Sequence, residues 1–291
     1  MQTTLITELQ AAHQIIRNAL QIMTTPQKSQ WGELNAQAGV EGEGVTRANE
    51  REAVIEAALA TAERAQPEAP AIALGQFITV PETTLPNGTV VPSFQVSQHL
   101  CSQDADSTPW VDISYHDARK ACEQAGTPLI TELQALAIAH NIASQDINWT
   151  GGKVGEGNVF QGLHKGNVDG VQAAGYESDD EEERRWHQLS NGERIFDFSG
   201  HAYTWVFDDV QGDESGIVAK AFAKDSPSIT APFPRAEKGM GWRPNVGADW
   251  SGNALIRSGY WSSGCSAGVF SLGYGFPDRE WGGVGFRCTK Q

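Results

Sequence analysis

The stretch Ala254–Cys288, ALIRSGYWSSGCSAGVFSLGYGFPDREWGGVGFRC, is the part of this 291-residue chain that decides the fold. Residues 239–288, which include it, hold 12 of the 31 glycines and four of the nine tryptophans. Glycine allows tight turns, and large aromatic side chains anchor loops by burying much area. This composition is typical of a loop-rich fold of short strands and argues against a helical bundle.

Upstream of that stretch, the pattern predicts a mixture of strands and helices. Two β-branched runs in Ala71–Val96 flank Leu85–Gly88, whose Asn-Gly pair is typical of a hairpin turn. Trp110–Ile113 is a third strand candidate. Helices are expected at Tyr115–Ala125, between an N-cap at Ser114 and a stop at Gly126, and at Thr131–Ala143.

The first 66 residues differ from the rest, since Trp31 is the one aromatic residue before position 77. Apolar residues at three- and four-residue steps predict amphipathic helices at Thr4–Met23 and Thr46–Gln66. We therefore expect a helical oligomerisation or attachment segment at 1–66, a linker at 67–70 and one domain at 71–291. An oligomeric stalk and an appended helical hairpin both remain open.

The formal net charge is −15, with a pI of about 4.8. Such acidity disfavours nucleic acid and anionic membrane surfaces as partners. Within Leu255–Cys288 the charges nearly cancel, and there is no cluster of Lys or Arg. No signal peptide and no run of 18 apolar residues is present, so we expect no membrane insertion. A virion or tail surface and the cytoplasm both remain open.

Cysteine, histidine and acidic residues give no metal pattern. Cys101, Cys122, Cys265 and Cys288 are widely spaced, which favours free thiols and leaves one bridge, such as Cys101–Cys122, open. The seven histidines show no zinc spacing. Residues 177–183, ESDDEEE, are expected to form a solvated loop, with a calcium site as the minor alternative. We expect no metal and no cofactor.

Four motifs in order resemble the formylglycine-generating-enzyme (sulfatase-modifying) version of the C-type lectin fold. They are Pro109–Ala118 continuing to Pro128–Glu132, Asp197–Trp205, Arg257–Trp261 and Gly285–Cys288. The resemblance implies an α+β lectin fold over roughly 71–289, loop-rich, with short antiparallel strands and two helices, preceded here by the N-terminal helical segment. It also implies that Trp205, Trp261, Phe286 and Arg287 are structural anchors.

The enzymatic activity of that family requires two cysteines after the R-G-G-S-W motif. The matching positions here are Ser263 and Gly268, and Cys265 is out of register. Thiolates are the nucleophile and the soft-metal ligands of that chemistry. We therefore expect no catalytic residue and no enzyme.

A second resemblance is to the variable proteins of diversity-generating retroelements, of the phage tropism-determinant type. It is carried by Asn148–Gly157, Gly162–His164, Arg184–Gly192 and the frame Ala254–Leu272. In that family a reverse transcriptase copies a template repeat and mutates its adenines, so the resemblance implies a variable region at about 255–288. The predicted ligand-binding residues are Tyr260, Ser262, Ser263, Cys265, Ser266, Gly273, Tyr274, Gly275, Phe276, Asp278, Arg279, Glu280 and Trp281.

Codons support most of that set. Mutating both adenines of an asparagine codon can yield Ser, Gly, Tyr, Phe, Asp, Arg or Cys, but neither Glu nor Trp. Glu280 and Trp281 therefore need other template codons or are fixed residues. Tyr, Trp, Ser and Gly are also the residues that dominate binding loops. The implied function is recognition of an unknown protein or cell-surface ligand, with homo-oligomerisation left open because several copies would raise avidity. The alternatives are an undiversified phage tail or decoration protein and a sulfatase-modifying-type oxidase.

Overall fold

The computed structural model describes residues 71–104 and 107–290. The chain divides into two units, Met1–Glu68 and Ala69–Gln291, and the described residues belong to the second. The helices expected at Thr4–Met23 and Thr46–Gln66 and the linker at 67–70 lie outside the described residues. They stay predictions.

The described part of the chain is α+β, with two α-helices and short strands, as the sequence predicts. The helices are α4 (Tyr115–Gln124) and α5 (Glu132–Ala143), and short 3-10 helices are η1 (Asp146–Asn148), η2 (Glu181–Glu183), η3 (Pro227–Ile229) and η4 (Gly264–Ser266). The strands are β1 (Phe77–Val80), β2 (Thr83–Thr84), β3 (Val90–Val91), β4 (Phe94–Ser97), β5 (Trp186–Gln188), β6 (Arg194–Phe196), β7 (Tyr203–Val206), β8 (Ala254–Arg257), β9 (Leu272–Gly275), β10 (Val284–Phe286) and β11 (Thr289–Lys290). In these residues no helix is long and apolar enough to cross a membrane.

A four-stranded sheet in the order β10-β7-β8-β9 separates two hydrophobic cores. Side chains alternate along β8, because successive residues of a strand point to opposite faces. Leu255 packs into the core that contains α5, whereas Ala254 and Ile256 pack into the core that contains α4. The pairs β7–β8 and β8–β9 are antiparallel, but β10–β7 is parallel, so the expectation of antiparallel strands holds for all but this pair.

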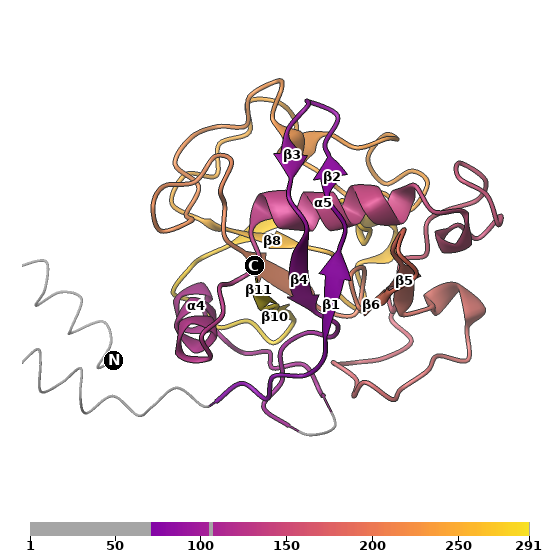
Figure 1. Ribbon diagram of the computed structural model, residues 1–291, viewed down its shortest axis with the longest axis horizontal. Coiled ribbons are helices and arrows are strands. Elements are labelled where there is room, and N and C mark those ends of the chain that lie inside the picture. Colours follow the sequence, from indigo (N-terminus) through magenta and orange to yellow (C-terminus); the bar gives the residue numbers. More distant parts are fainter. Residues whose placement is uncertain (1–70, 105–106, 291) are drawn as a thin grey trace, which may run out of the picture. The chain divides into compact units, whose positions relative to one another are not determined.

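A second sheet joins the two ends of the domain. Its order is β1-β4-β11, so the C-terminal strand pairs with β4 near the start of the domain, as Figure 1 shows around the label C. Between β1 and β4 the chain forms the predicted hairpin, in which β2 pairs with β3 and Gly88 takes a positive φ of 87°. Only glycine adopts that conformation without strain.

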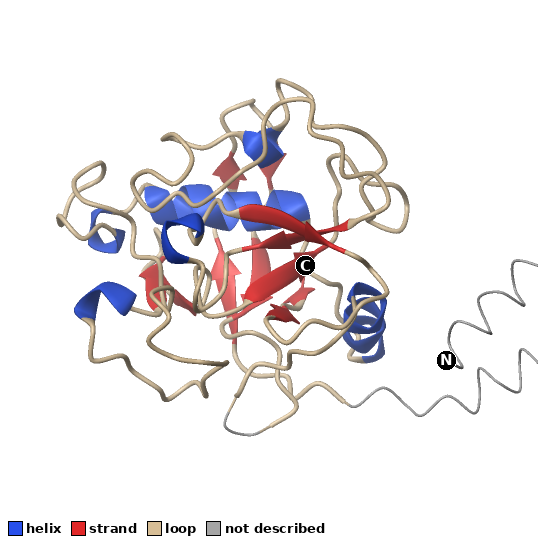
Figure 2. Ribbon diagram, turned by 180° about the vertical axis from the view of Figure 1, so that it is seen from behind, coloured by secondary structure: helices blue, strands red, loops and turns tan. Residues whose placement is uncertain are grey.

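Both helices begin and end within one residue of the predicted bounds. Ser114 caps α4 by accepting a hydrogen bond from the Asp117 backbone, and Gly126 follows the helix with φ of 70°. Thr131 and Gln134 form a capping box at the start of α5. In Figure 1 this longer helix lies across the direction of β2 and β3, and Figure 2 shows it in blue from behind; nine of its residues are buried.

The strand predicted at Trp110–Ile113 does not form. Trp110 donates from its backbone to the Cys101 carbonyl, and Asp112 donates to the Trp281 carbonyl. Asp112 also has a φ of 56°, in the left-handed region, which ends extended backbone. The apolar pattern at this position reflects packing of an irregular segment rather than strand pairing.

Candidate binding face

Buried charged residues fix the scaffold beneath the C-terminal segment. Arg257, at the end of β8, donates from Nε to the Glu132 carboxylate of α5 at 2.7 Å, and both side chains are almost fully buried. Arg287 is also buried and binds the carbonyls of Ser97 and Phe196, which lie in β4 and β6. The motif residues Glu132, Arg257 and Arg287 therefore hold separate segments together.

A second buried network lies under the turn that precedes β7. Arg185 forms two hydrogen bonds with the Asp197 carboxylate, at 2.8 and 2.9 Å, and His201 Nδ1 lies 3.2 Å from the same group. Burial alone would raise the pKa of Asp197, but His201 and Arg185 together hold it well below its usual range. The ionised carboxylate thus fixes the loop that leads to Tyr203.

Several of the predicted binding residues belong to two groups in the structure. The first group lines what we call the ring pocket, a hollow of about 600 Å³ formed by Tyr203, Tyr260 and residues 279–284. The rings of Tyr203 and Tyr260 stack with centroids 5.3 Å apart, and Trp261 meets Tyr260 edge-on at 5.0 Å. The Ser263 hydroxyl accepts from the Tyr260 backbone at 3.0 Å, which fixes this loop.

The second group surrounds Tyr274 on strand β9. Its ring lies 4.8 Å from that of Trp250, which stacks in turn on Trp242 at 6.3 Å, and we call these three residues the tryptophan cluster. The Trp242 backbone donates to the Ser266 carbonyl and accepts from the Leu272 amide. Trp242 is therefore held between two stretches of predicted binding residues.

Exposure differs along the predicted set. Ser262, Cys265, Tyr274, Phe276, Asp278, Arg279 and Glu280 are exposed; Tyr260, Ser263, Ser266, Gly273 and Trp281 are half-buried. Asp278 lies 3.5 Å from His116 of α4, and the Arg279 guanidinium lies 5.6 Å from the Phe276 ring centre. Trp281 packs partly against the core that contains α4, so it is less open to solvent than predicted.

Gly275 is buried, and its predicted place on the exposed face is wrong. A Cβ at this position would lie 2.6 Å from the Trp205 ring, well inside van der Waals contact. The register of β8 with β9 explains this, because Gly275 is paired with Ala254 on the face that Trp205 fills. Tyr274, paired with Leu255, points to the other face.

Three residues of this region were missed by sequence reasoning: Tyr203, Trp242 and Trp250. They lie outside the segment that resembles a variable region, and each reaches it through tertiary contacts. For Trp242 and Trp250 the available signal was the high tryptophan content of residues 239–288, which does not extend to Tyr203. Trp261, expected to be a core anchor, is half-buried, whereas Trp205, Phe286 and Arg287 are fully buried as expected.

The acidic run at 177–183 is more ordered than a solvated loop. Glu183 is 1% exposed and accepts from the backbone amides of His164 and Lys165, while Lys165 Nζ pairs with Asp180 at 2.6 Å. The expectation of a solvated loop is thus wrong for Glu183. Among the described residues, no group of three or more His, Cys, Asp or Glu side chains could hold a metal ion.

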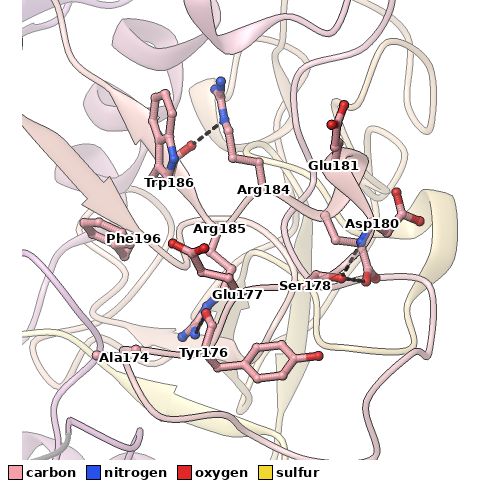
Figure 3. A pocket seen from close by; sticks show the side chains of 12 residues that line it. Ala174, Tyr176, Glu177, Ser178, Asp180, Glu181, Arg184, Arg185, Trp186 and Phe196 are labelled. Atoms are coloured by element: carbon pink, nitrogen blue, oxygen red, sulfur yellow. Dashed lines mark hydrogen bonds between the residues drawn. The ribbon is translucent and has the colours of Figure 1, made fainter.

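Beside this run lies a second hollow of about 360 Å³, seen from close by in Figure 3. Tyr176, Trp186 and Phe196 contribute its rings, and the Arg184 guanidinium stacks 3.7 Å from the Trp186 ring centre. Burial, together with the nearby Arg194, lowers the pKa of Arg184 to about 10. The Arg184 guanidinium is therefore packed against the Trp186 ring and is not an isolated cation at the surface.

Comparisons with known proteins give distant structural matches. The chain is similar to PvdO from Pseudomonas aeruginosa (10% identity, 77% of this chain and 99% of that chain, TM-score 0.42). It is also similar to Treponema denticola variable protein 1 (10% identity, 76% and 92%, TM-score 0.39) and to the Major Tropism Determinant P3c variant (16% identity, 63% and 39%, TM-score 0.32). No protein-family model and no curated protein matches the chain.

Proposed function

We propose that this protein is a non-catalytic ligand-binding protein that recognises its target through the ring pocket and the tryptophan cluster. One observation carries the proposal. Within the described residues, the exposed Phe, Trp and Tyr side chains are Trp242, Tyr274 and Phe276, at 40%, 45% and 54%, and all three lie within residues 239–288. Large exposed aromatic side chains that gather in one region mark interaction sites.

The scaffold suits such a role because it is rigid beneath the face. Tyr and Trp offer large contact area with few rotatable bonds, so ordering them on binding costs little entropy. Arg257 and Glu132 fix the strand that precedes the ring pocket, and η4 carries the exposed Cys265. Less of the binding free energy is then lost to the ordering of loops when the ligand binds.

The absence of a second thiol supports a role without catalysis. Gly268, one of the two positions that the oxidase alternative requires as cysteine, is buried, and a Cβ there would collide with the backbone of Met240 and Gly241. Cysteine does not fit at this position without a backbone shift. The other position, Ser263, carries a hydroxyl, which is neither the nucleophile nor the soft ligand of that chemistry.

A binding assay tests the proposal. The labelled full chain is applied to a panel of intact bacterial cells, and retention is measured by flow cytometry. We expect the Tyr274→Ser, Phe276→Ser double variant to lose at least tenfold in apparent affinity, because two aromatic contacts at a hot spot contribute about 2 kcal/mol or more. Val90→Ser is the control, since Val90 is 53% exposed on the β2–β3 hairpin. Equal loss in both variants would contradict the proposal.

We further propose that a retroelement diversifies this face. The test is the flanking DNA, which should hold a near-copy of the 260–288 coding region beside a reverse transcriptase gene, with differences confined to template adenines. If no such copy exists, the undiversified tail or decoration protein becomes the better account. The position of Gly275 adds a sharper expectation, since variation at its codon should be rare in related copies.

A further inference from the structure

An aromatic hollow outside the C-terminal segment lies beside the acidic run. It is the hollow of about 360 Å³ in Figure 3, which we call the Tyr176 hollow, and its rings come from Tyr176, Trp186 and Phe196. A further recess of about 540 Å³ shares Tyr176 and Glu181 with it. The two together offer room for more than one side chain of a ligand.

Both arginines at this hollow are engaged inside the domain. The Arg184 guanidinium packs on the rings of Phe160 and Trp186, 3.8 and 3.7 Å from their centres. Arg185 is buried and forms two hydrogen bonds with the Asp197 carboxylate. Both charges are thus used by neighbouring groups, which disfavours an anionic ligand.

Two carboxylates at the hollow are not engaged in this way. Glu177 and Glu181 are exposed, and within residues 71–104 and 107–290 neither has an ion-pair partner. Asp180, in contrast, pairs with Lys165 at 2.6 Å. The unbalanced charge at the hollow is therefore negative.

A buried carboxylate adds to this negative potential. Glu183 is 1% exposed and also lines the hollow. Its carboxylate accepts four hydrogen bonds, from the backbone amides of His164 and Lys165 and from the side chains of Asn167 and Ser178. Burial alone would raise the pKa of Glu183, but these hydrogen bonds together hold it below its usual value. All four donors are neutral groups, so they keep Glu183 ionised without cancelling its charge.

The walls of the hollow are held in place by the protein itself. Arg185 donates from Nη1 to the carbonyls of Ala173 and Tyr176, both at 2.8 Å. The Phe196 ring stacks on His99, with ring centres 4.5 Å apart. A preformed site loses little binding free energy to the ordering of its own groups.

We propose that the Tyr176 hollow is a second binding site, which takes an arginine or lysine side chain from a basic segment of a partner protein. Aromatic rings suit a cation because the ring face carries negative potential. Glu177 and Glu181 supply the opposite charge from exposed positions. In Figure 3 the Tyr176 ring and the Arg184 side chain lie at opposite ends of the hollow, so a cation stacked on Tyr176 is separated from the Arg184 charge.

Fluorescence anisotropy with a labelled tetra-arginine peptide tests the proposal on the full chain. The titration is run at about 0.15 M salt, which screens the general attraction of an acidic chain for a basic peptide. We expect the Glu177→Gln, Glu181→Gln double variant to weaken binding about fivefold, because it removes both unpaired carboxylates. Glu214→Gln, Glu237→Gln is the matched control. It removes the same charge from exposed positions outside the hollow and should leave the dissociation constant unchanged within error.

Substitutions of Tyr176 test the aromatic wall without changing the charge. Tyr176→Ser should weaken binding of tetra-arginine about threefold, because the cation loses the ring on which it stacks. Tyr176→Phe keeps the ring and should keep the affinity. Circular dichroism shows whether each variant folds; if Tyr176→Ser does not, the two exposed glutamates still test the claim.

Several outcomes would overturn the inference. Equal weakening in the Glu214→Gln, Glu237→Gln control would mean that the peptide responds only to the overall charge. Tetra-arginine that does not bind the unmodified chain, a folded Tyr176→Ser variant with unchanged affinity, or a tetra-glutamate peptide that binds as tightly would each contradict a cation site.

This site and the C-terminal face can be tested separately. The Tyr274→Ser, Phe276→Ser variant should keep its affinity for tetra-arginine, because both residues lie outside the Tyr176 hollow. A loss of affinity in that variant would place the peptide on the C-terminal face and overturn the inference.

Discussion

Replacing Gly275 by alanine tests whether this position of β9 serves as part of the packed scaffold. The added Cβ would lie 2.6 Å from the Trp205 ring, about 0.8 Å closer than ordinary carbon contacts allow. Trp205 is fully buried, and its Nε1 donates to the Ile113 carbonyl at 3.0 Å, so the ring cannot move without weakening that bond. Overpacking of this kind costs about 1–3 kcal/mol.

Gly273→Ala is the matched control, two residues earlier on the same strand and the same face. Its Cβ would lie 3.2 Å from Cγ1 of Ile256 and 3.5 Å from the terminal Cδ1, so a shift of the Ile256 side chain by a few tenths of an ångström would accommodate it. Both substitutions change the strand propensity equally, so their difference reports the contact with Trp205. We expect Gly275→Ala to unfold at a midpoint lower than Gly273→Ala by about 2–10 °C.

The assay is thermal unfolding followed by tryptophan fluorescence, supported by urea titration of both variants. Unfolding midpoints that agree within error would refute the reasoning. They would mean that β9 or the Trp205 ring moves to accommodate the added Cβ at little cost in unfolding free energy. Gly275 would then tolerate an added side chain as well as Gly273 does.

Three further predictions concern the buried Glu132–Arg257 pair, the buried His187 and residues 1–66. Glu132→Gln should cost about 3–5 kcal/mol of unfolding free energy, because it leaves the buried Arg257 without its counter-charge, whereas Glu123→Gln in an exposed pair should cost less than about 1 kcal/mol in the same urea titration. Burial lowers the pKa of His187 from 6.5 to about 4 in the folded chain, so the unfolded chain takes up a proton first as the pH falls. The contribution of His187 to the unfolding free energy should therefore fall by about 3 kcal/mol from pH 6.5 to 4, and His187→Gln should remove that part of the pH dependence of urea unfolding. Deleting residues 1–66 should leave the domain folded by circular dichroism but lower its retention on a multivalent surface; equal retention would contradict a role of this segment in oligomerisation.

Local chemistry explains which expectations about the fold were met. Ser114, Thr131 and Gly126 act through hydrogen bonds and backbone angles of their immediate neighbours, so the helix ends could be predicted from a few residues. The turn at Gly88 follows from the same kind of local preference. The strand predicted at Trp110–Ile113 was wrong because this segment packs on and hydrogen-bonds with distant segments. A local pattern of apolar residues does not show such contacts.

The binding face could be predicted only as a stretch of sequence. Whether a residue in that stretch reaches solvent depends on strand register, and a shift of one position exchanges the faces of Tyr274 and Gly275. Tyr203, Trp242 and Trp250 join the face from other segments, so their roles depend on contacts that the chain makes only when folded.

The sequence by itself therefore determined the α+β class, the helix ends, the hairpin and three of the four expected anchors, because these depend on short-range geometry and on burial of large or charged side chains. The tertiary structure alone decided the ion pair of Glu132 with Arg257 and the meeting of Cys101, Cys122 and Cys288. These groups are separated by 125 to 187 positions. Contacts at such separations follow from how the sheets close around two cores, a property of the whole domain rather than of any segment.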